Sequence, residues 1–557
     1  MSRRKRTRLA GFSAMAAMGL LALPGVASAT VTSNVGAGGV LSVTSDGSDP
    51  ITIVCTGGNV QVNGADPGGT ATACSAIASI GVRGGPGANN INLNGVTTAA
   101  FTGLNSVIVN GGDGNDTIAG SEFPDLLNGS TGNDRVIGQR NAGGTRDQML
   151  GGVGDDTLVW NPGDGDDTMD GEAGFDTIEV NGGGGGEEFE VKPSATAGRV
   201  QFDRLGPSPT PGPFNLDIGT SEKLDFNGNG GDDTLDKNGG ASGLNPFLID
   251  ADGGEGNDII QTGDAPDVLR GGPGNDRLVS QRSPSGDDDV VAGGDGDDTL
   301  VWNPGDGDDT MDGEAGTDTI EVNGGNVDED FVVKPSADPG RVQFDRVGPT
   351  PPGPFNLDIG TSEKLVLNAN GGNDTLIGRK GLARLIKATL NGGDGNDRIK
   401  GTDGRDRISG GNGIDVIRSR DRAADRVECD AGFDLALVDK RDTVRGCEIV
   451  LGGSLRVKHS AKSVSLTGNR AELKLRCLSS GTCKGKVKLV YKGKSLGSKS
   501  FKIKSKKSKT IGVKVGTRGT RLLAKHSKKG LKVKLRIDAR DSKGNGWRTT
   551  DPLRLKL

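Results

Sequence analysis

The stretch GGDGNDRIKGTDGRDRISGGNGIDVIR, Gly392–Arg418, repeats a nine-residue pattern three times in succession. The pattern is G-G-x-G-x-D-x-U-x, where U is a large apolar residue. It also reads GGDGNDTIA at Gly111–Ala119 and GGPGNDRLV at Gly271–Val279. A short fixed period is typical of solenoids, in which each repeat buries its apolar side chains only by stacking on its neighbours. The sequence therefore predicts a repeat protein.

Each position of the repeat has a physical reason. Glycines at the first, second and fourth places reach positive φ at little cost, so a tight turn can direct several carbonyl oxygens inward. The aspartate at the sixth place adds a carboxylate, and calcium prefers a mixed set of oxygen ligands of this kind. The last three residues form a short strand whose middle side chain, such as Ile118, Leu278 or Ile399, points into the core.

These glycine–aspartate repeats resemble the hemolysin-type (RTX) calcium-binding repeats, most closely at 111–179, 253–321 and 392–418. The resemblance implies a parallel β-roll in which two repeats complete one turn and Ca²⁺ lies between loops stacked on the same edge. A repeat should then share an ion with the repeat after next. RTX toxins usually carry a C-terminal export signal, which this sequence does not resemble, so the likeness implies calcium binding and not toxicity.

Aspartates at the sixth position are the predicted calcium ligands. In the three uninterrupted runs the outer repeats keep the pattern best and give three pairs: Asp116 with Asp134, Asp258 with Asp276, and Asp397 with Asp415. The middle repeats lack some glycines and supply weaker candidates on the opposite edge: Asp125, Asp267 and Asp406. Two runs lengthened by an extra Trp-Asn supply the remaining candidates: Asp156, Asp167, Asp176, Asp298, Asp309 and Asp318. Partial motifs near Asp233 and Asp374 lack neighbours in register and are not expected to form full sites.

A disordered, glycine-rich acidic linker is the alternative to an ordered roll. Against it, an apolar residue follows nearly every aspartate at the same spacing, and a linker has no reason to keep that phase. An EF-hand is excluded by spacing, since Thr168 breaks the alternation of ligands that Asp166 begins, and Thr177 occupies the position of the closing glutamate.

Motifs of secreted enzymes are missing from the sequence. A zinc protease needs H-E-x-x-H, whereas the chain has only His459 and His526, and no G-x-S-x-G elbow occurs. The repeat already explains the abundant carboxylates, so glycoside hydrolysis has no separate support. We therefore expect a calcium-binding structural or adhesive surface protein and no enzyme. The alternative is a secreted hydrolase or protease with an unrecognised active site.

Residues 1–29 are predicted to be a secretory signal peptide, with a basic start, the apolar stretch Ala10–Leu23 and a small-residue cleavage site. No later segment is apolar enough to span a bilayer. An even number of cysteines in an exported chain favours disulfides over a zinc site. The expected pairs are local: Cys55 with Cys74, Cys429 with Cys447, and Cys477 with Cys483. The mature protein is expected to be secreted and extracellular, with association to the cell surface open.

A longer duplication overlies the nonapeptides. VWNPGDGDDTMDGEAG occurs at 159–174 and again at 301–316, so 111–252 and 253–391 are two copies of one unit. Each copy carries a strand-rich insert, which is expected to add rungs to the coil without metal loops.

The ends of the solenoid are expected to be capped. Residues 30–110 form the predicted N-terminal cap, and 392–450 form a partial third unit that closes with the Cys429–Cys447 segment. Trp160 and Trp302 are expected to pack within the coil, with a sugar-binding platform as the alternative.

The charge changes abruptly near residue 451. Residues 451–557 contain 31 Lys and Arg against four acidic residues, whereas the rest of the chain has a net charge of −33. Segments such as AELKLRCL and KVKLVYKG alternate apolar with cationic residues, the period of strands with one solvated face. They predict a small immunoglobulin-like β-sandwich at 454–557.

The positive charge of this domain could bind teichoic acid, anionic lipid, nucleic acid or acidic polysaccharide. The alternative is that the charged residues only form a solvated surface or attract the acidic solenoid of the same chain. Specific nucleic-acid binding is not expected, because only Phe501, Tyr491 and Trp547 are available for stacking on bases.

Overall fold

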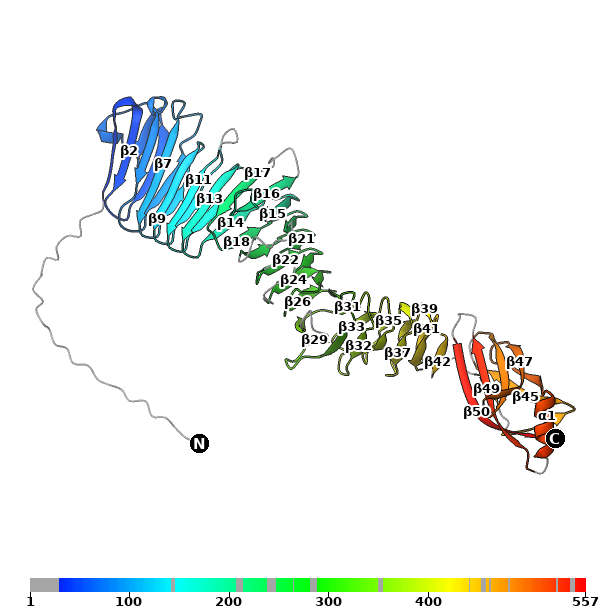
Figure 1. The fold of residues 1–557 in the computed structure, drawn as a ribbon. Helices are drawn as coiled ribbons and strands as arrows, with labels where there is room; N and C mark the ends of the chain where they lie inside the picture. The colour runs from blue at the N-terminus through cyan, green and yellow to red at the C-terminus, as the bar shows by residue number, and fades with distance from the viewer. Residues whose placement is uncertain are drawn as a thin grey trace, which may run out of the picture.

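In a computed structural model, the protein forms a long β-solenoid followed by a small antiparallel β-domain (Figure 1). The predicted signal peptide lies outside the described residues. The parallel pairing of the solenoid strands confirms the predicted all-β roll of repeats. The residues that the structure describes are 30–141, 146–206, 214–237, 247–263, 265–280, 288–348, 354–439, 441–451, 457–459, 462–478, 481–526, 529–540 and 546–557.

Successive strands of the repeats alternate between two sheets, and each pairs in parallel with the strand after next. The first sheet contains β1 (Val31–Val35), β2 (Val40–Ser45), β5 (Ser79–Arg83), β7 (Ser106–Asp113), β9 (Asp125–Thr131), β11 (Gln148–Val153), β13 (Asp167–Ala173), β15 (Glu188–Pro193), β16 (Val200–Gly206), β17 (Phe214–Gly219), β19 (Thr234–Lys237), β21 (Ile259–Gln261), β23 (Arg277–Val279), β25 (Thr299–Trp302), β27 (Thr319–Asn323), β31 (Lys364–Asn368), β33 (Lys387–Asn391), β35 (Arg407–Ser409), β38 (Arg426–Glu428) and β41 (Thr443–Arg445). The second sheet contains β3 (Pro50–Thr56), β4 (Asn59–Val62), β6 (Asn90–Gly95), β8 (Thr117–Ala119), β10 (Arg135–Ile137), β12 (Thr157–Trp160), β14 (Thr177–Asn181), β18 (Lys223–Asn227), β20 (Leu248–Asp252), β22 (Val268–Pro273), β24 (Val290–Gly296), β26 (Thr310–Gly316), β28 (Asp330–Pro335), β29 (Val342–Gly348), β30 (Phe355–Gly360), β32 (Thr375–Gly378), β34 (Arg398–Lys400), β37 (Val416–Ser419), β40 (Leu435–Val438) and β42 (Ile449–Leu451). Between loops, β36 (Asn412–Gly413) pairs with β39 (Ala431–Gly432).

The core lies between the two sheets and consists of the apolar residue of each repeat. Ile118 pairs with Val136 across β8 and β10, and both are fully buried. Because side chains alternate along a strand, a three-residue strand buries one side chain and exposes two. Stacking in parallel register then forms one continuous apolar column, which extends from the N-terminal coils to the third unit.

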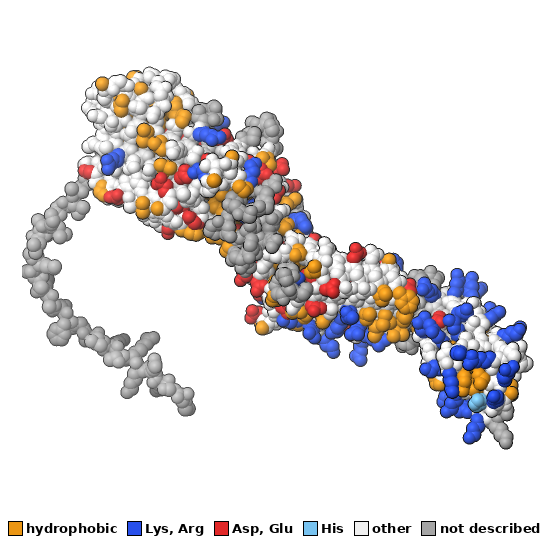
Figure 2. Space-filling view, viewed as in Figure 1, with side chains coloured by type: hydrophobic (Ala, Val, Ile, Leu, Met, Phe, Trp, Pro, Cys, Tyr) orange, Lys and Arg blue, Asp and Glu red, His pale blue; other side chains and the backbone are white. Residues whose placement is uncertain are grey.

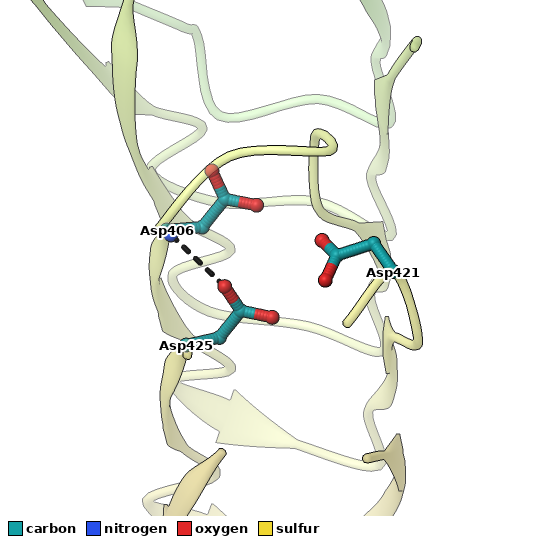
Figure 3. Close-up of side chains that lie close together, drawn as sticks. All are labelled: Asp406, Asp421 and Asp425. Atoms are coloured by element: carbon teal, nitrogen blue, oxygen red, sulfur yellow. Dashed lines mark hydrogen bonds between the residues drawn. The ribbon is translucent and has the colours of Figure 1, made fainter. Parts of the chain in front are cut away.

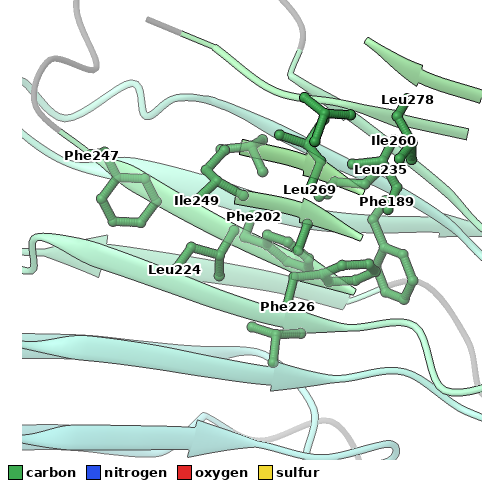
Figure 4. Packing of buried hydrophobic residues seen from close by; sticks show 14 of the residues in the cluster. Phe189, Phe202, Leu224, Phe226, Leu235, Phe247, Ile249, Ile260, Leu269 and Leu278 are labelled. Atoms are coloured by element: carbon green, nitrogen blue, oxygen red, sulfur yellow. The ribbon is translucent and has the colours of Figure 1, made fainter. Parts of the chain in front are cut away.

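The strand-rich inserts differ from the expected rungs. In the first unit β17 pairs in parallel with β13, β16 lies antiparallel between β17 and β15, and β15 pairs in parallel with β19. All three insert strands therefore join one sheet (Figure 1), while the other sheet continues directly from β14 through β18 to β20. The expectation that the insert adds whole rungs is wrong, because its antiparallel turns return the chain to the same sheet. Phe189, Phe202 and Phe226 fill the interior beneath it (Figure 4).

The two copies of the unit place equivalent strands in opposite sheets. The insert strands β15–β17 of the first copy belong to the first sheet, whereas their counterparts β28–β30 belong to the second. One unit spans 13 strands, from β13 to β25, and its insert strands β15, β16 and β17 lie together in one sheet. The chain therefore changes sheet an odd number of times within a unit, so β26, the counterpart of β13, lies in the other sheet. Residues that are equivalent in the sequences of the two copies therefore lie on opposite edges of the solenoid.

Both duplicated tryptophans pack inside the solenoid. Trp160 and Trp302 are each 2% exposed, and their rings stack on Phe214 and Phe355 at centroid distances of 3.8 and 3.7 Å. The Trp160 indole N–H donates to the carbonyl oxygen of Gly165 at 3.0 Å. This burial leaves no ring face for a sugar, so the packing interpretation holds.

Antiparallel strands and a disulfide close the N-terminal end of the solenoid. β1 folds back on β2, and β4 folds back on β3, so the first coil presents no free parallel edge. The Cys55–Cys74 disulfide joins β3 to the short 3₁₀ helix η3 (Cys74–Ala76), and further 3₁₀ turns are η1 (Ala37–Gly39) and η2 (Pro67–Gly69). The Cys429–Cys447 and Cys477–Cys483 disulfides also form, which confirms all three predicted pairs.

The basic C-terminal domain has its own apolar core and touches the last coil of the solenoid. Among the described residues it contains β43 (Val457–His459), β44 (Ser463–Thr467), β45 (Arg470–Cys477), β46 (Cys483–Tyr491), β47 (Lys494–Ile503), β48 (Ser508–Lys514), α1 (Thr517–Lys525), β49 (Leu531–Arg540) and β50 (Gly546–Lys556). Pairing is antiparallel except between β44 and β50. The backbone N–H of Gly546 donates to the carbonyl oxygen of Cys447 at 2.6 Å. The sequence did not indicate α1, and the immunoglobulin-like topology stays a prediction.

The stacked tryptophans generate a prediction for stability. Trp160→Ala should weaken the coils around β12 and β17 by about 3–5 kcal/mol, the usual cost of deleting a buried indole. Trp160→Phe, which keeps an aromatic ring against Phe214, should lose much less. Hydrogen exchange measured peptide by peptide checks this, because a long repeat array need not unfold as one unit. Equal protection of the wild-type and alanine forms would show that the ring stack contributes nothing.

Candidate metal-binding loops

Each sixth-position aspartate lies at the start of a short strand and faces into the solenoid. Asp116 precedes β8 and Asp134 precedes β10, and both residues are 2% exposed. The turn before Asp134 contains Gly132 at φ 131°, where a Cβ would also clash with the carbonyl oxygen of Gly114 in the preceding coil. Glycine is therefore required both for the dihedral angle and for the close stacking that brings the carboxylates inside the edge.

The aspartates of one edge form a hydrogen-bonded ladder. The backbone N–H of Asp116 donates to Oδ1 of Asp134 at 2.7 Å, and the N–H of Asp134 donates to Oδ1 of Asp156 at 2.7 Å. The N–H of Asp156 then donates to Oδ1 of Asp176 at 2.9 Å. Each aspartate thus stacks on that of the repeat after next, whose strand lies in the same sheet. The Trp-Asn insertion does not interrupt the stack.

The same ladder recurs in the second and third units. The structure brings together the predicted pair Asp258 and Asp276 at 2.8 Å and the pair Asp397 and Asp415 at 2.9 Å, each from backbone nitrogen to Oδ1. Asp276 continues through Asp298 to Asp318 at 2.8 and 3.0 Å.

The weaker candidates lie on the opposite edge, as expected, and each joins a shorter ladder. The ladders run from Asp125 through Asp147 to Asp167, from Asp267 through Asp289 to Asp309, and from Asp406 through Asp425 to Asp442. Sequence reasoning missed Asp147, Asp289, Asp425 and Asp442 on this edge, and Asp434, which follows Asp415 on the first edge, because their loops keep at most one of the three repeat glycines. An aspartate followed two places later by a buried apolar residue, as in Asp289 and Val291, is the signal that could have found them.

Asp233 and Asp374 correct the sequence analysis. The N–H of Asp233 donates to Oδ1 of Asp258 at 2.8 Å, and the N–H of Asp374 donates to Oδ1 of Asp397 at 2.8 Å. Both residues therefore have ladder neighbours in register, contrary to expectation. On their other side the neighbours are Glu187 and Glu329, 46 and 45 residues earlier in the chain. The inserts separate these neighbours in sequence while strand pairing brings them together.

The second oxygen of each carboxylate is the feature that fits a cation. Oδ2 is buried and has no hydrogen-bond partner among the described residues in Asp116, Asp134, Asp147, Asp156, Asp167, Asp176, Asp233, Asp258, Asp276, Asp289, Asp298, Asp318, Asp374, Asp397, Asp415, Asp425 and Asp434. A Cβ on Gly129 would clash with both Oδ2 of Asp134 and the carbonyl oxygen of Gly151 in the next coil. Carboxylate and carbonyl oxygens therefore converge beside the first glycine of the repeat. Burying such oxygens without a partner is costly, and calcium takes both kinds as ligands.

Burial and mutual repulsion raise the pKa values of these carboxyl groups. Loss of hydration raises the pKa of Asp134 to about 6 and that of Asp156 to about 7, and the charges of neighbouring aspartates add to the effect. On the opposite edge the pKa values of Asp147 and Asp289 rise to about 9 for the same reasons. The charged form of every ladder is therefore unfavourable unless a positive charge compensates it.

A guanidinium supplies that positive charge at one end of two ladders. Arg204 pairs with Glu187 at 2.5 Å and Arg346 pairs with Glu329 at 2.6 Å, with all four side chains buried. These glutamates occupy the aspartate position at the start of the inserts. An arginine side chain of the protein thus compensates the negative charge at the end of each of these two ladders.

Comparison with protein families agrees with this geometry. The model of the RTX calcium-binding nonapeptide repeat matches residues 110–140, 163–185, 252–281, 285–301, 305–326, 366–381 and 388–417. The matched segments of the solenoid are RTX calcium-binding repeats. RTX repeats bind calcium, and the matched ranges contain most of the ladder aspartates. No curated protein matches the chain.

The raised pKa values predict how the calcium-free RTX solenoid responds to pH. The pKa values of folded ladder carboxyl groups are raised, to about 6 for Asp134 and about 9 for Asp289, above the unfolded value of about 3.9, so the folded state binds more protons. Stability in calcium-free buffer should therefore fall as the pH rises from about 4 through that range.

Thermal melts followed by circular dichroism at pH 5 and pH 8 measure this trend. Saturating calcium should abolish the loss at pH 8, because the ion compensates the charge that protons compensate in acid. A calcium-free protein that is equally stable or more stable at pH 8 would contradict the burial of the ladder charges.

Proposed function

We propose that the protein is a secreted, non-catalytic structural protein whose solenoid tightens when calcium enters between stacked loops after export. The observation that carries this proposal is the row of buried Oδ2 atoms that have no partner among the described residues. An extracellular location is supported by the three disulfides, which persist in oxidising compartments. Within the described ranges no helix is long and apolar enough to cross a lipid bilayer.

The stack of four aspartates in the first unit is a candidate for several neighbouring ions. Asp116, Asp134, Asp156 and Asp176 follow one another in adjacent coils, so three gaps between loops lie along one edge. An ion in each gap would touch two coils and would therefore couple binding to stacking. Short stacks of this kind favour the modest dissociation constants of extracellular modules, roughly 10⁻⁴–10⁻³ M. Such a solenoid would remain loose in a calcium-poor cytoplasm.

A pair of adjacent substitutions tests the calcium sites. Asp156→Asn keeps an acceptor for the N–H of Asp134 but removes the carboxylate from two gaps, so calorimetric titration should show fewer bound calcium ions. Asp155→Asn is the matched control, because the Asp155 side chain is exposed in the same loop and accepts the N–H of Phe175. Its calcium binding should equal that of the wild type. An unchanged number of ions in Asp156→Asn, or the same loss in both variants, would refute the assignment.

The basic C-terminal domain is proposed to hold the protein on an anionic surface polymer. Lysine and arginine side chains are spread over the face of the domain seen in Figure 2, and Lys492, Lys532 and Lys534 line a groove together with Tyr491 and Arg536. Few acidic residues compensate this charge within the domain. The attraction would be electrostatic, and it should weaken as salt shortens the range of the interaction.

Replacing Lys492, Lys532 and Lys534 together by glutamate tests this second role. The variant should elute from dextran sulfate and from teichoic acid resin at lower salt than the wild type. The corresponding triple arginine variant keeps the charge and should elute like the wild type. Identical elution of all three proteins would exclude this face of the domain as the anchor.

A further inference from the structure

Three aspartates of the third unit approach one another at a place where one of two stacked loops has lost its glycines. The loop before β35 reads GTDGRD at Gly401–Asp406, and the loop stacked on it reads RDRAAD at Arg420–Asp425. Asp406 and Asp425 occupy the ladder position, while Asp421 occupies the position of the second glycine. The carboxylate of Asp421 therefore stands where the repeat pattern has a glycine and no side chain.

The three carboxylates point toward one another across this edge (Figure 3). One oxygen of each lies within 4.8 Å of the others. The N–H of Asp406 donates to Oδ1 of Asp425 at 3.1 Å, so these two residues are fixed as ladder neighbours. Asp421 faces them from the other side of the loop and is half-buried.

Two oxygens in the cluster are left without a partner. The Asp406 carboxylate accepts the N–H and the hydroxyl of Thr402, each at 2.7 Å, and Oδ1 of Asp421 accepts the N–H of Ala423 at 2.6 Å. Oδ2 of Asp425, a residue only 1% exposed, and Oδ2 of Asp421 are buried and accept no hydrogen bond from the described residues. Within the same residues no lysine, arginine or histidine forms an ion pair with any of the three.

The oxygen set differs from that of the regular repeats. At Gly129 an added Cβ would meet Oδ2 of the ladder aspartate and also the carbonyl oxygen of the next coil. At Gly401 the three nearest atoms are Oδ2 and Cγ of Asp406 and Cδ1 of Ile408, and none of them is a carbonyl oxygen of the next coil. Asp421 therefore supplies, from a side chain, an oxygen where the repeat uses the backbone.

We propose that Asp406, Asp421 and Asp425 form a separate calcium site, with carboxylate ligands in place of the glycine carbonyls of the RTX loops. Three carboxylates suit a hard divalent cation, which prefers oxygen ligands and tolerates irregular geometry. Three carboxylates this close to one another repel, so the cluster is unfavourable as three bare anions.

The cluster borders a groove on one side. Asp421 lines this groove of about 680 Å³ together with Lys400, Arg418 and Arg422. Water entering from the groove can complete the coordination of the ion, since three aspartates supply fewer than the usual six to eight ligand atoms if each binds through one oxygen. The ion would join β35 to β38, where the loop before β38 lacks the glycines of the repeat.

Asp421→Asn in the mature full-length protein tests this site. Asp421 takes no part in the ladder, so the variant should keep the fold, which circular dichroism verifies. Asp394→Asn, an exposed loop aspartate of the same unit that accepts the amide of Asn412, is the matched control. Equilibrium dialysis with radioactive calcium should show one ion fewer in Asp421→Asn and no change in Asp394→Asn.

Crystals soaked in terbium, a calcium substitute, locate the ions directly. An anomalous peak should lie about 2.3–2.6 Å from oxygens of Asp406, Asp421 and Asp425 in the wild type, and it should vanish in Asp421→Asn while peaks in the repeat loops remain. Peaks in the repeat loops without one at the cluster would overturn this site and leave the proposed function standing. A cluster peak that survives in Asp421→Asn would also overturn it, and an absence of ions everywhere would overturn both proposals.

Discussion

Rows of like charge held inside the edges of the solenoid are the constraint on which the rest of the structure depends. The backbone of one coil binds Oδ1 of the next aspartate, as between Asp134 and Asp156, and this hydrogen bond turns the carboxylate away from water. Oδ2 is then buried beside a glycine carbonyl. The coils stack closely enough to form the apolar column only if this charge is compensated. The stability of the core therefore depends on the metal loops.

The chain compensates the charge in different ways along its length. Regular repeats present carboxylate and carbonyl oxygens for calcium, whereas the start of each insert uses a buried guanidinium, Arg204 or Arg346, against a glutamate. Asn89 occupies the ladder position before Asp116 with a neutral amide, and its backbone N–H still donates to that aspartate at 2.7 Å. The hydrogen bonds of the ladder therefore also form where a neutral residue needs no cation. The solenoid can extend beyond its metal loops into the N-terminal coils for this reason.

Much of this architecture could be predicted from sequence because the decisive interactions are local. The nine-residue phase fixed the loops, the short strands and the inward apolar residue, and it also predicted that Asp258 stacks on Asp276. The predictions that were wrong concern features set by pairing between strands that are far apart in the sequence. The neighbours of Asp233 and Asp374 lie across the inserts, and the return of the insert to one sheet is decided by the antiparallel pairing of β15, β16 and β17. Asp147 and Asp289 were missed because stacking holds them in the ladder without the glycines that made the other repeats recognisable.

Amide hydrogen exchange at pH 7.5, with calcium and with a chelator, tests the dependence of stacking on the ion most directly. Chelation should strip protection from the strands that follow Asp116, Asp134, Asp156 and Asp176, while the N-terminal coils before residue 84 and the basic domain keep theirs. Protection of those repeat strands that is identical in chelator and in calcium would contradict a solenoid held together by cations between its loops.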